Sequence, residues 1–320
     1  MYAESTRIMN YQFPNMNYPS SPDKITRDYF DSLLLETRYM DSDVASTEVE
    51  ILGHHFDTPI MTAALSHLGS KGKQSASFIE HQAESGMIVY AEAAARCNTL
   101  HWVGMGDDQE LEDIVATGAK TVKVIKPHKD NAEVLRKINH AVTTGCVAVG
   151  MDIDHAYNGT GGYDSVFGLE MRPKSTEEIR DLVQAAGVPF VVKGVLSAWD
   201  AERCAKAGCR GIVVSHHHGM MQYAVAPLMV IDDILKAVGT DMEVFVDCGI
   251  VSGMDAYKCL ALGAKAVSVG RHLMPLLKHG PEVVAARIQE MTAELRMVMN
   301  RTAVRSLQEM DPSVIHRRQF

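Results

Sequence analysis

The amino-acid sequence predicts a single closed α/β barrel, the (β/α)8 or TIM-barrel architecture, from its length and from one repeated unit. In that unit a helical stretch ends in a small residue and a glycine, and an apolar strand follows. A chain of 320 residues accommodates such a barrel, which needs about 250 residues. A doubly wound sheet also alternates strands with helices, but eight units within about 210 residues favour the closed barrel.

The expected strands are short apolar runs, which are typical of parallel strands buried on both faces. The first spans residues 59–63, and each later strand follows a glycine that accepts the left-handed conformation closing a last helical turn. Glu84-Ser85-Gly86 is the earliest of these helix ends. The seven later strands span residues 87–90, 121–125, 147–149, 190–192, 211–214, 244–246 and 264–269.

Two further segments flank the strands. Residues 1–57 are expected to form an N-terminal extension that packs on the barrel, capping its bottom or draping over it. Residues 58–320 are expected to form the barrel itself. Apolar residues at helical spacing over 281–305 predict a helix that closes the barrel wall.

Composition is typical of a globular enzyme that acts on a small molecule. With 46% hydrophobic and 22% charged residues, the chain is neither disordered nor fibrous. The net charge of -9 and the absence of a basic run argue against a nucleic-acid partner. No apolar run reaches the roughly 18 residues of a membrane span, and the N-terminus lacks a signal-peptide pattern. We therefore expect a cytoplasmic protein without a membrane partner, whose six scattered cysteines are reduced thiols.

Polar residues stand where several expected strands finish, which is where barrel enzymes carry their chemistry. They are Asp152, Lys193, Ser215 with the histidines that follow it, Asp247 with Gly249, and Gly270 with Arg271. Glycine lets backbone N–H groups approach an anion, and a guanidinium binds phosphate, so the last two strand ends predict a phosphate site. The alternative is that these glycines only form tight turns.

Lys193 and the triplet His216 to His218 each allow a structural and a chemical interpretation. An ammonium at the end of a buried strand must meet an anion or an electron-rich group, and an ion pair with Asp152 or Asp247 is the structural alternative. Neighbouring residues point to opposite faces, so three consecutive histidines do not easily share one ion, and no metal is expected. One histidine facing the barrel mouth is expected to act as an acid or base, and a solvated loop is the alternative.

Several linked motifs at these strand ends resemble a known family. They are Val192-Lys193-Gly194-Val195-Leu196, Gly211 to Ser215 with His217 and Gly219, Val246-Asp247 with Gly249, Gly253 and Asp255, Ala261-Leu262-Gly263-Ala264, and Gly270-Arg271. Over residues 188–275 these motifs are similar to the FMN-dependent α-hydroxy-acid dehydrogenases and oxidases, and the chain resembles a divergent member of that family.

The resemblance implies an FMN-binding barrel in which a hydride equivalent passes from a hydroxy compound to flavin N5. His217 is the implied base, with Asp152 holding its imidazole, and Lys193 is implied to lie at the N1 and O2 edge of the flavin. The other implied cofactor contacts are Ser215 at the ring or ribityl chain, Asp247 at the ribityl hydroxyls, Gly249, Gly270 and Arg271 at the phosphate, and Ala64 after the first strand.

Departures from the family pattern concentrate where the substrate acid binds. Met220 stands where the family has a carboxylate-binding arginine, Lys126 stands near a carboxylate-binding tyrosine, and residues 154–160 lack an expected arginine. The phosphate-side arginine after strand seven is absent at 251–252, and Ala64 replaces a proline. A guanidinium contact to a carboxylate contributes roughly 1.5 to 3 kcal/mol, which methionine cannot supply.

Two substrate hypotheses follow from these departures. In one, Lys126, helped by Lys123 or His218, holds an acid in a different pose; in the other, the substrate is a larger alcohol whose apolar part meets Met220. Extra residues around 93–106 either roof such a pocket or pack on the barrel exterior.

The sequence therefore predicts an FMN-dependent oxidoreductase that oxidises a 2-hydroxy acid or a related hydroxy compound with a histidine base. One alternative is an FMN-dependent isomerase without net redox, similar to type 2 isopentenyl diphosphate isomerase. Another is a barrel that binds flavin or phosphate without catalysis. The resemblance also implies a homo-oligomer, a tetramer, acting on a small-molecule substrate.

Overall fold

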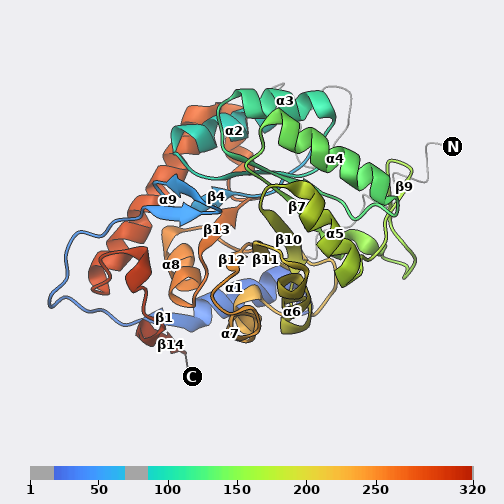
Figure 1. Ribbon diagram of the computed structural model, residues 1–320. Coiled ribbons are helices and arrows are strands. Elements are labelled where there is room, and N and C mark those ends of the chain that lie inside the picture. The colour runs from blue at the N-terminus through green and yellow to red at the C-terminus, as the bar shows by residue number, and fades with distance from the viewer. Residues whose placement is uncertain (1–17, 69–85, 319–320) are drawn as a thin grey trace.

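The computed structural model describes residues 18–68 and 86–318, and one parallel sheet of eight strands forms its centre. In sheet order the strands are β4 (Ile60–Thr62), β13 (Ala266–Val269), β12 (Glu243–Val246), β11 (Gly211–Val214), β10 (Phe190–Val195), β7 (Ala148–Asp152), β6 (Thr121–Ile125) and β5 (His101–Val103). The end strands β4 and β5 meet where the Thr62 amide donates to the Leu100 carbonyl at 3.3 Å. The sheet is therefore a nearly closed barrel, which confirms the predicted fold (Figure 1).

Helices surround this sheet, and most of them connect one strand to the next (Figure 1). They are α1 (Pro22–Ser32), α2 (Gly86–Arg96), α3 (Asp108–Ala116), α4 (Asn131–Thr144), α5 (Thr176–Ala186), α6 (Ala198–Ala207), α7 (Pro227–Val238), α8 (Gly253–Ala261) and α9 (Pro281–Arg301). Left-handed glycines end α4, α5 and α6 at Gly145, Gly187 and Gly208, as predicted. Among the described residues, no helix is both long and apolar enough to cross a bilayer.

The second strand of the barrel differs from the prediction. Residues 87–90 belong to α2, and the strand is β5, which follows that helix. Gly86 begins α2 in close contact with the preceding chain, since a Cβ there would lie 2.8 Å from the Leu68 carbonyl oxygen. A helix that is largely buried reads as an unbroken apolar run, and periodicity alone does not separate it from a strand. Glu84 and Ser85 lie outside the described residues.

The prediction of an insertion around residues 93–106 is also wrong, because the apolar run before it, which predicts the second strand, belongs to a buried helix. These residues are the end of α2, the strand β5 and the loop after it. Trp102 is only 2% exposed and packs inside the barrel with Met61 and Phe245, so it roofs no pocket.

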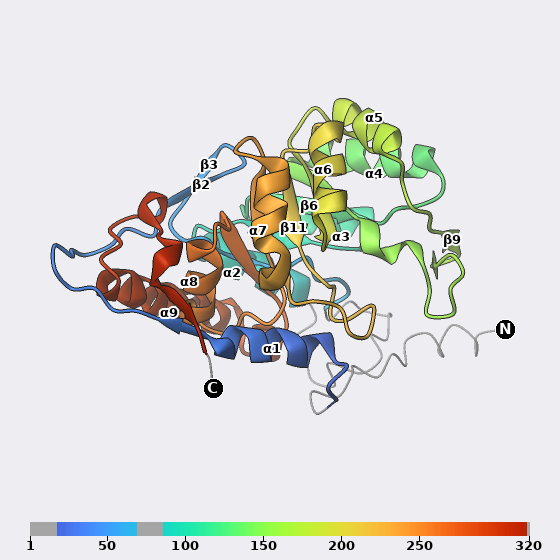
Figure 2. The same cartoon turned by 90° about the horizontal axis from the view of Figure 1, so that it is seen from below.

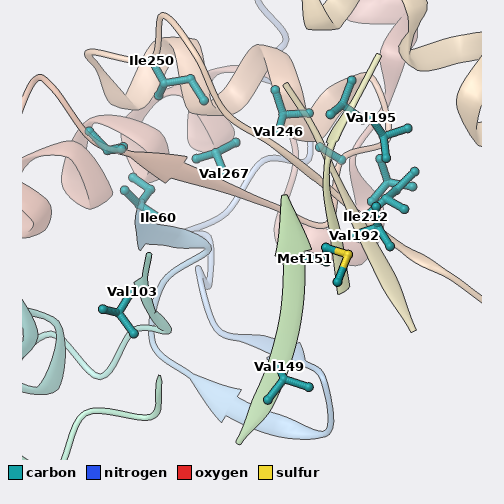
Figure 3. Packing of buried hydrophobic residues seen from close by; sticks show 14 of the residues in the cluster. Ile60, Val103, Val149, Met151, Val192, Val195, Ile212, Val246, Ile250 and Val267 are labelled. Carbon is teal, nitrogen blue, oxygen red and sulfur yellow. The ribbon is translucent and has the colours of Figure 1, made fainter. Parts of the chain in front are cut away.

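Buried side chains alternate between the two faces of each strand, and this alternation decides what points into the barrel. One face packs against the helices and includes Val149, Met151, Val192, Ile212 and Val246, which are labelled in Figure 3. The other face fills the barrel interior with Ala148, Val191, Val213 and Phe245. Followed to the carboxyl end of each strand or just past it, this period of two places Asp152, Lys193, Ser215 and Asp247 on the side of the barrel interior.

The described part of the N-terminal segment packs on both ends of the barrel. The hairpin of β2 (Val49–Ile51) and β3 (His54–Phe56) covers the amino ends of the strands, where the Leu52 amide donates to the Glu243 carboxylate at 3.0 Å. Helix α1 lies at the carboxyl ends instead, and Figure 2 shows it on the opposite side of the barrel from this hairpin. Residues 1–17 of the expected extension lie outside the described residues.

Short elements complete the fold. Strand β1 pairs antiparallel with β14 near the chain's end, and β8 pairs with β9 in a small hairpin after β7. Their bounds are β1 (Leu33–Leu35), β14 (Ile315–Arg317), β8 (Ser165–Val166) and β9 (Leu169–Glu170). The 3-10 turns are η2 (Ile153–Ala156), η3 (Met274–His279), η4 (Leu307–Glu309) and η5 (Pro312–Val314).

Candidate functional site

Four charged side chains meet at the mouth of the barrel, at the carboxyl ends of β6, β7, β10 and β12. Lys126 Nζ lies 2.8 Å from Asp152 Oδ2. Lys193 Nζ lies 3.3 Å from Asp152 Oδ1 and 3.6 Å from Asp247 Oδ2. All four residues are buried, and cations alternate with carboxylates, so each buried charge has an opposite neighbour. Lys193 therefore makes both of the ion pairs that the sequence left open.

Burial and neighbouring charges act in opposite directions on this cluster. Burial disfavours the ionised carboxyl of Asp152, but Lys126 and Lys193 hold its pKa well below the usual range. Burial also opposes the charge on Lys193, yet Asp152 and Asp247 raise its pKa above the ordinary value. The Lys193 ammonium is therefore a fixed positive charge in the wall of the barrel mouth.

His217 is held by a carboxylate that the sequence analysis did not select. Its Nδ1 lies 3.0 Å from Asp154 Oδ1, but 3.7 Å from Asp152 Oδ1 and 3.4 Å from Lys193 Nζ. Asp154 sits in the 3-10 turn η2, directly above Gly194, where a Cβ would lie 2.5 Å from the Asp154 carboxyl carbon. Asp152 is thus the counterion of the lysines, and Asp154 is the nearer partner of the imidazole.

His155 contacts the other side of the same imidazole. The two Nε2 atoms of His155 and His217 lie 3.1 Å apart, with the ring planes at 74°. One nitrogen must donate and the other accept, so a single proton occupies this contact. Burial lowers the pKa of His155, which favours its neutral form. His155 lies within 154–160, the segment in which the expected arginine is absent.

Asp152, His155 and His217 also bring one ligand atom each to within 4.8 Å of one another, a spacing that could hold a metal ion. Lys126 and Lys193 already contact the two oxygens of Asp152, and these cations oppose the entry of a third. The geometry therefore favours a proton-handling cluster over a metal centre.

A cavity of about 320 Å³ opens beside this cluster, at the ends of β10, β12, β13 and β4. Of the predicted site residues, it is lined by Ala64, Lys193, His217, His218, Asp247, Gly249, Gly270 and Arg271. Gly249 has a left-handed φ of 75°, and a Cβ there would lie 2.7 Å from the Thr26 side chain. A Cβ on Gly270 would lie 3.1 Å from the Cβ of Ala63. Both turns therefore need glycine for close packing around the cavity.

Ser215 and Met220 do not line this cavity, and neither do Lys126 and Asp152, which contact each other. Ser215 is buried, and its hydroxyl oxygen accepts a hydrogen bond from the His217 amide at 3.1 Å. It supports the histidine loop rather than facing the cavity. His216 is bound to Thr26 of α1 at 2.8 Å, while Met220 is 37% exposed on the surface.

Helix α1 adds two charged residues to the cavity that the sequence analysis missed. Asp23 accepts hydrogen bonds from both Nη atoms of Arg271, at 2.5 and 2.7 Å. Arg27 donates to the Gly249 carbonyl at 3.3 Å and to Asp255 at 2.9 and 3.1 Å. No local pattern in α1 marks these residues, because their place depends on how the helix crosses the barrel.

Comparison with known proteins agrees with this geometry. The FMN-dependent dehydrogenase family matches the chain over residues 23–178 and 170–317. The chain is 35% identical to an L-lactate oxidase of Nostoc sp. over 170 residues, which cover 52% of this chain and 46% of that protein. This alignment thus spans less than half of the relative's own length. With glycolate oxidase 3 of Arabidopsis thaliana the identity is 25% over 360 residues, which cover 96% and 94% of the two chains.

The fold is also similar to solved structures. A mandelate oxidase variant with a monooxide FMN adduct superposes on this chain with a TM-score of 0.80 and 26% identity. The superposition covers 93% of this chain and 92% of that one. The similarity therefore extends over the whole barrel rather than over the strand-end motifs alone.

Proposed function

The chain belongs to the FMN-dependent dehydrogenase family, and on that premise we propose that it oxidises a 2-hydroxy acid or a related hydroxy compound. The observation that carries this proposal is the buried cluster at the barrel mouth. There a fixed ammonium, Lys193, lies 3.4 Å from the imidazole of His217, and both line one cavity. A cation that stabilises a reduced ring and a base that accepts a hydroxyl proton are the two groups that this oxidation requires.

The residues around the cavity fit FMN. Its volume of about 320 Å³ falls at the lower end of the range for small-molecule sites. Lys193 is proposed to face the N1 and O2 edge of the flavin, and Asp247 the ribityl hydroxyls. The tight turns at Gly249 and Gly270 bring backbone close to the cavity, which suits a phosphate. When bound, FMN supplies the acceptor for a hydride equivalent from the substrate carbon.

Arg27 and Arg271 are proposed to hold the phosphate together. Arg271 comes from the end of β13, and Arg27 enters from α1 beside Gly249, close to the strand end where the family arginine is absent. Each guanidinium also binds a carboxylate, Asp255 for Arg27 and Asp23 for Arg271, so the two arginines are oriented before an anion arrives.

His217 is proposed as the base that accepts the substrate's hydroxyl proton. Its Nδ1 faces Asp154 and its Nε2 contacts His155, so Nε2 accepts the substrate proton only when the substrate hydroxyl takes the place of His155 at this nitrogen. Once Nε2 is protonated, the Asp154 carboxylate stabilises the imidazolium and keeps the ring oriented. Lys193 opposes the new positive charge, so the carboxylates of Asp154 and Asp152 must outweigh it.

The substrate acid is proposed to meet imidazoles instead of an arginine. His155 lies on the Nε2 side of His217, and His218 lines the cavity. Lys126 is bound to Asp152, which does not favour the acid-binding role considered for it. Met220 does not line the cavity, which does not favour its contact with the apolar part of a larger alcohol. A neutral hydrogen bond contributes about 1 kcal/mol, less than a charged one, so weak binding of glycolate or lactate is expected.

The proposal is tested by an anaerobic screen of hydroxy acids and alcohols against the FMN-loaded protein, followed by flavin absorbance. We expect purified protein to be yellow and at least one 2-hydroxy acid to bleach it. Colourless protein that cannot be reconstituted with FMN would refute the proposal, as would a flavin that no hydroxy compound in the screen reduces.

A further inference from the structure

A second cavity, of about 550 Å³, lies beside the barrel mouth and shares no lining residue with the first. We call it the side cavity. Its floor comes from the end of β6 with Lys123 and His128, and its roof from the β8–β9 hairpin with Phe167 and Leu169. Met105, after β5, completes one wall. None of the residues proposed to hold FMN lines this cavity.

Lys123 is a buried ammonium without a carboxylate partner among the described residues. It is 7% exposed, and its Nζ donates to the Gly104 carbonyl at 2.5 Å. Burial and the neighbouring charge of Lys137 lower its pKa to about 8, so the amine is still mostly charged at neutral pH. One neutral acceptor does not compensate a buried charge, and an anion in the side cavity would.

His128 offers a second group to the same anion. It is 6% exposed, and its Nδ1 has no hydrogen-bond partner within the described chain. Burial lowers the pKa of His128 to about 4, so at neutral pH it is an uncharged imidazole that still offers one N–H. His128 and Lys123 line the same cavity, and a buried ring nitrogen without a partner is a group that a ligand there could satisfy.

The other cations that line the side cavity are already paired, and the Asp107 carboxylate at its rim accepts a hydrogen bond from the Glu110 amide. Arg136 binds Asp108 at 2.8 Å and Glu133 at 2.8 Å, and Lys137 lies 3.3 Å from Glu133. The rim thus contributes little net charge, and the attraction for an anion concentrates at Lys123.

The roof supplies an apolar surface. Phe167 is 64% exposed and Leu169 is 42% exposed, although both line the cavity. Phe167 also sits in a left-handed turn with φ of 52°, which a phenylalanine rarely adopts. An apolar ligand beneath Phe167 and Leu169 would bury the exposed surface of both side chains, which is favourable in free energy.

We infer that the side cavity binds an organic carboxylate with an apolar body. The carboxylate lies between Lys123 Nζ and His128, and the apolar body lies under Phe167 and Leu169. The site requires neither FMN nor turnover, so it stands apart from the proposed oxidation. Lys126 lines the cavity and binds Asp152, so a bound carboxylate lies next to the charged cluster of the barrel mouth.

The test is a calorimetric titration of the full-length protein with octanoate, which has a carboxylate and an apolar chain but no hydroxyl to oxidise. We expect saturable binding. Octan-1-ol keeps the chain without the charge, and inorganic phosphate keeps a charge without the chain, so both should bind at least tenfold more weakly. Octanoate that fails to bind at millimolar concentration, or phosphate that binds equally well, would overturn the inference.

Two variants locate the site. Lys123→Met should weaken octanoate binding at least tenfold, because it removes the buried cation. Lys206→Met removes an exposed cation of α6 that is paired with Glu202 and does not line the cavity, so it should change affinity less than twofold. Phe167→Ala changes an exposed position and should weaken octanoate binding while leaving the fold intact, so it decides the matter even if the Lys123 variant misfolds. Unchanged affinity in the Phe167 variant, or in a folded Lys123 variant, would contradict the assignment.

Discussion

The two carboxylates near His217 have different partners and different electrostatic roles. Asp152 neutralises Lys126 and Lys193, and Asp154 holds the imidazole. The alternation of side chains along a strand predicts that Asp152 and Lys193 face the barrel interior, because each follows an interior residue by an even number of positions. It cannot predict Asp154, whose place depends on a 3-10 turn that reverses the chain over Gly194.

Replacing Asp154 by Asn should slow flavin reduction by the substrate by roughly ten- to a hundredfold, because the imidazolium loses its nearest negative charge. FMN affinity should stay within about twofold, since Asp154 does not line the cofactor cavity. Rapid-mixing measurement of flavin absorbance gives the rate, and fluorescence titration gives the affinity. A reduction rate equal to that of the unchanged protein would reject this role for Asp154.

Replacing Arg27 by Ala should weaken FMN binding by roughly ten- to a hundredfold, which corresponds to losing one charged hydrogen bond to phosphate. Asp31→Ala is a matched control, because it removes an exposed partner of Arg27 and leaves the guanidinium in place. Equilibrium dialysis of both variants with FMN measures the difference. Equal affinities in the two variants would exclude Arg27 as a phosphate ligand.

Whole strands and helices can be predicted from local signals where a strand is buried on both faces or a helix has an explicit cap. The glycine caps of α4, α5 and α6 and the run of β6 are of this kind. Strand β5 was missed because its three residues, His101 to Val103, include a histidine and a tryptophan rather than a run of valine or isoleucine. The polar His101 is nevertheless fully buried, where its Nδ1 faces the Thr62 hydroxyl at 2.8 Å.

His101 should make the protein sensitive to acid. Burial lowers its pKa to about 3, while an unfolded histidine titrates near 6.5. The stability that depends on its neutral form is complete above pH 6.5 and is lost as the pH falls towards 3, by about 1.4 kcal/mol per pH unit. Between pH 7 and pH 5 this residue should therefore account for a loss of about 2 kcal/mol. Urea unfolding should show that loss diminished in His101→Gln, and an identical pH dependence in that variant would refute it.

At the scale of the molecule, the N-terminal segment joins the two ends of the barrel. Its hairpin covers the amino ends through Glu243, and α1 carries Asp23 and Arg27 to the carboxyl ends. The strand order and the eight-fold repeat could be predicted from sequence because they depend on neighbouring segments. The position of α1 could not, because it depends on contacts between residues more than 200 positions apart.

Because the proposed cofactor site lies between α1 and the strands, FMN should stabilise the whole chain. At a free FMN concentration one hundred times its dissociation constant, the gain should be about 2.7 kcal/mol. Removing FMN should therefore lower the melting temperature measured by calorimetry, and adding it back should restore the original value. A melting temperature that does not respond to FMN would exclude binding of FMN to the folded chain.

The most direct measurement of the central claim is anaerobic reduction of the bound flavin in the protein and in its His217→Ala variant. Both forms should bind FMN with similar affinity, because the phosphate and ring contacts come from other residues. A 2-hydroxy acid that bleaches the unchanged protein should leave the variant yellow over the same period. If the variant is reduced as fast as the unchanged protein, the imidazole at this position is not the base, and the account of the site is wrong.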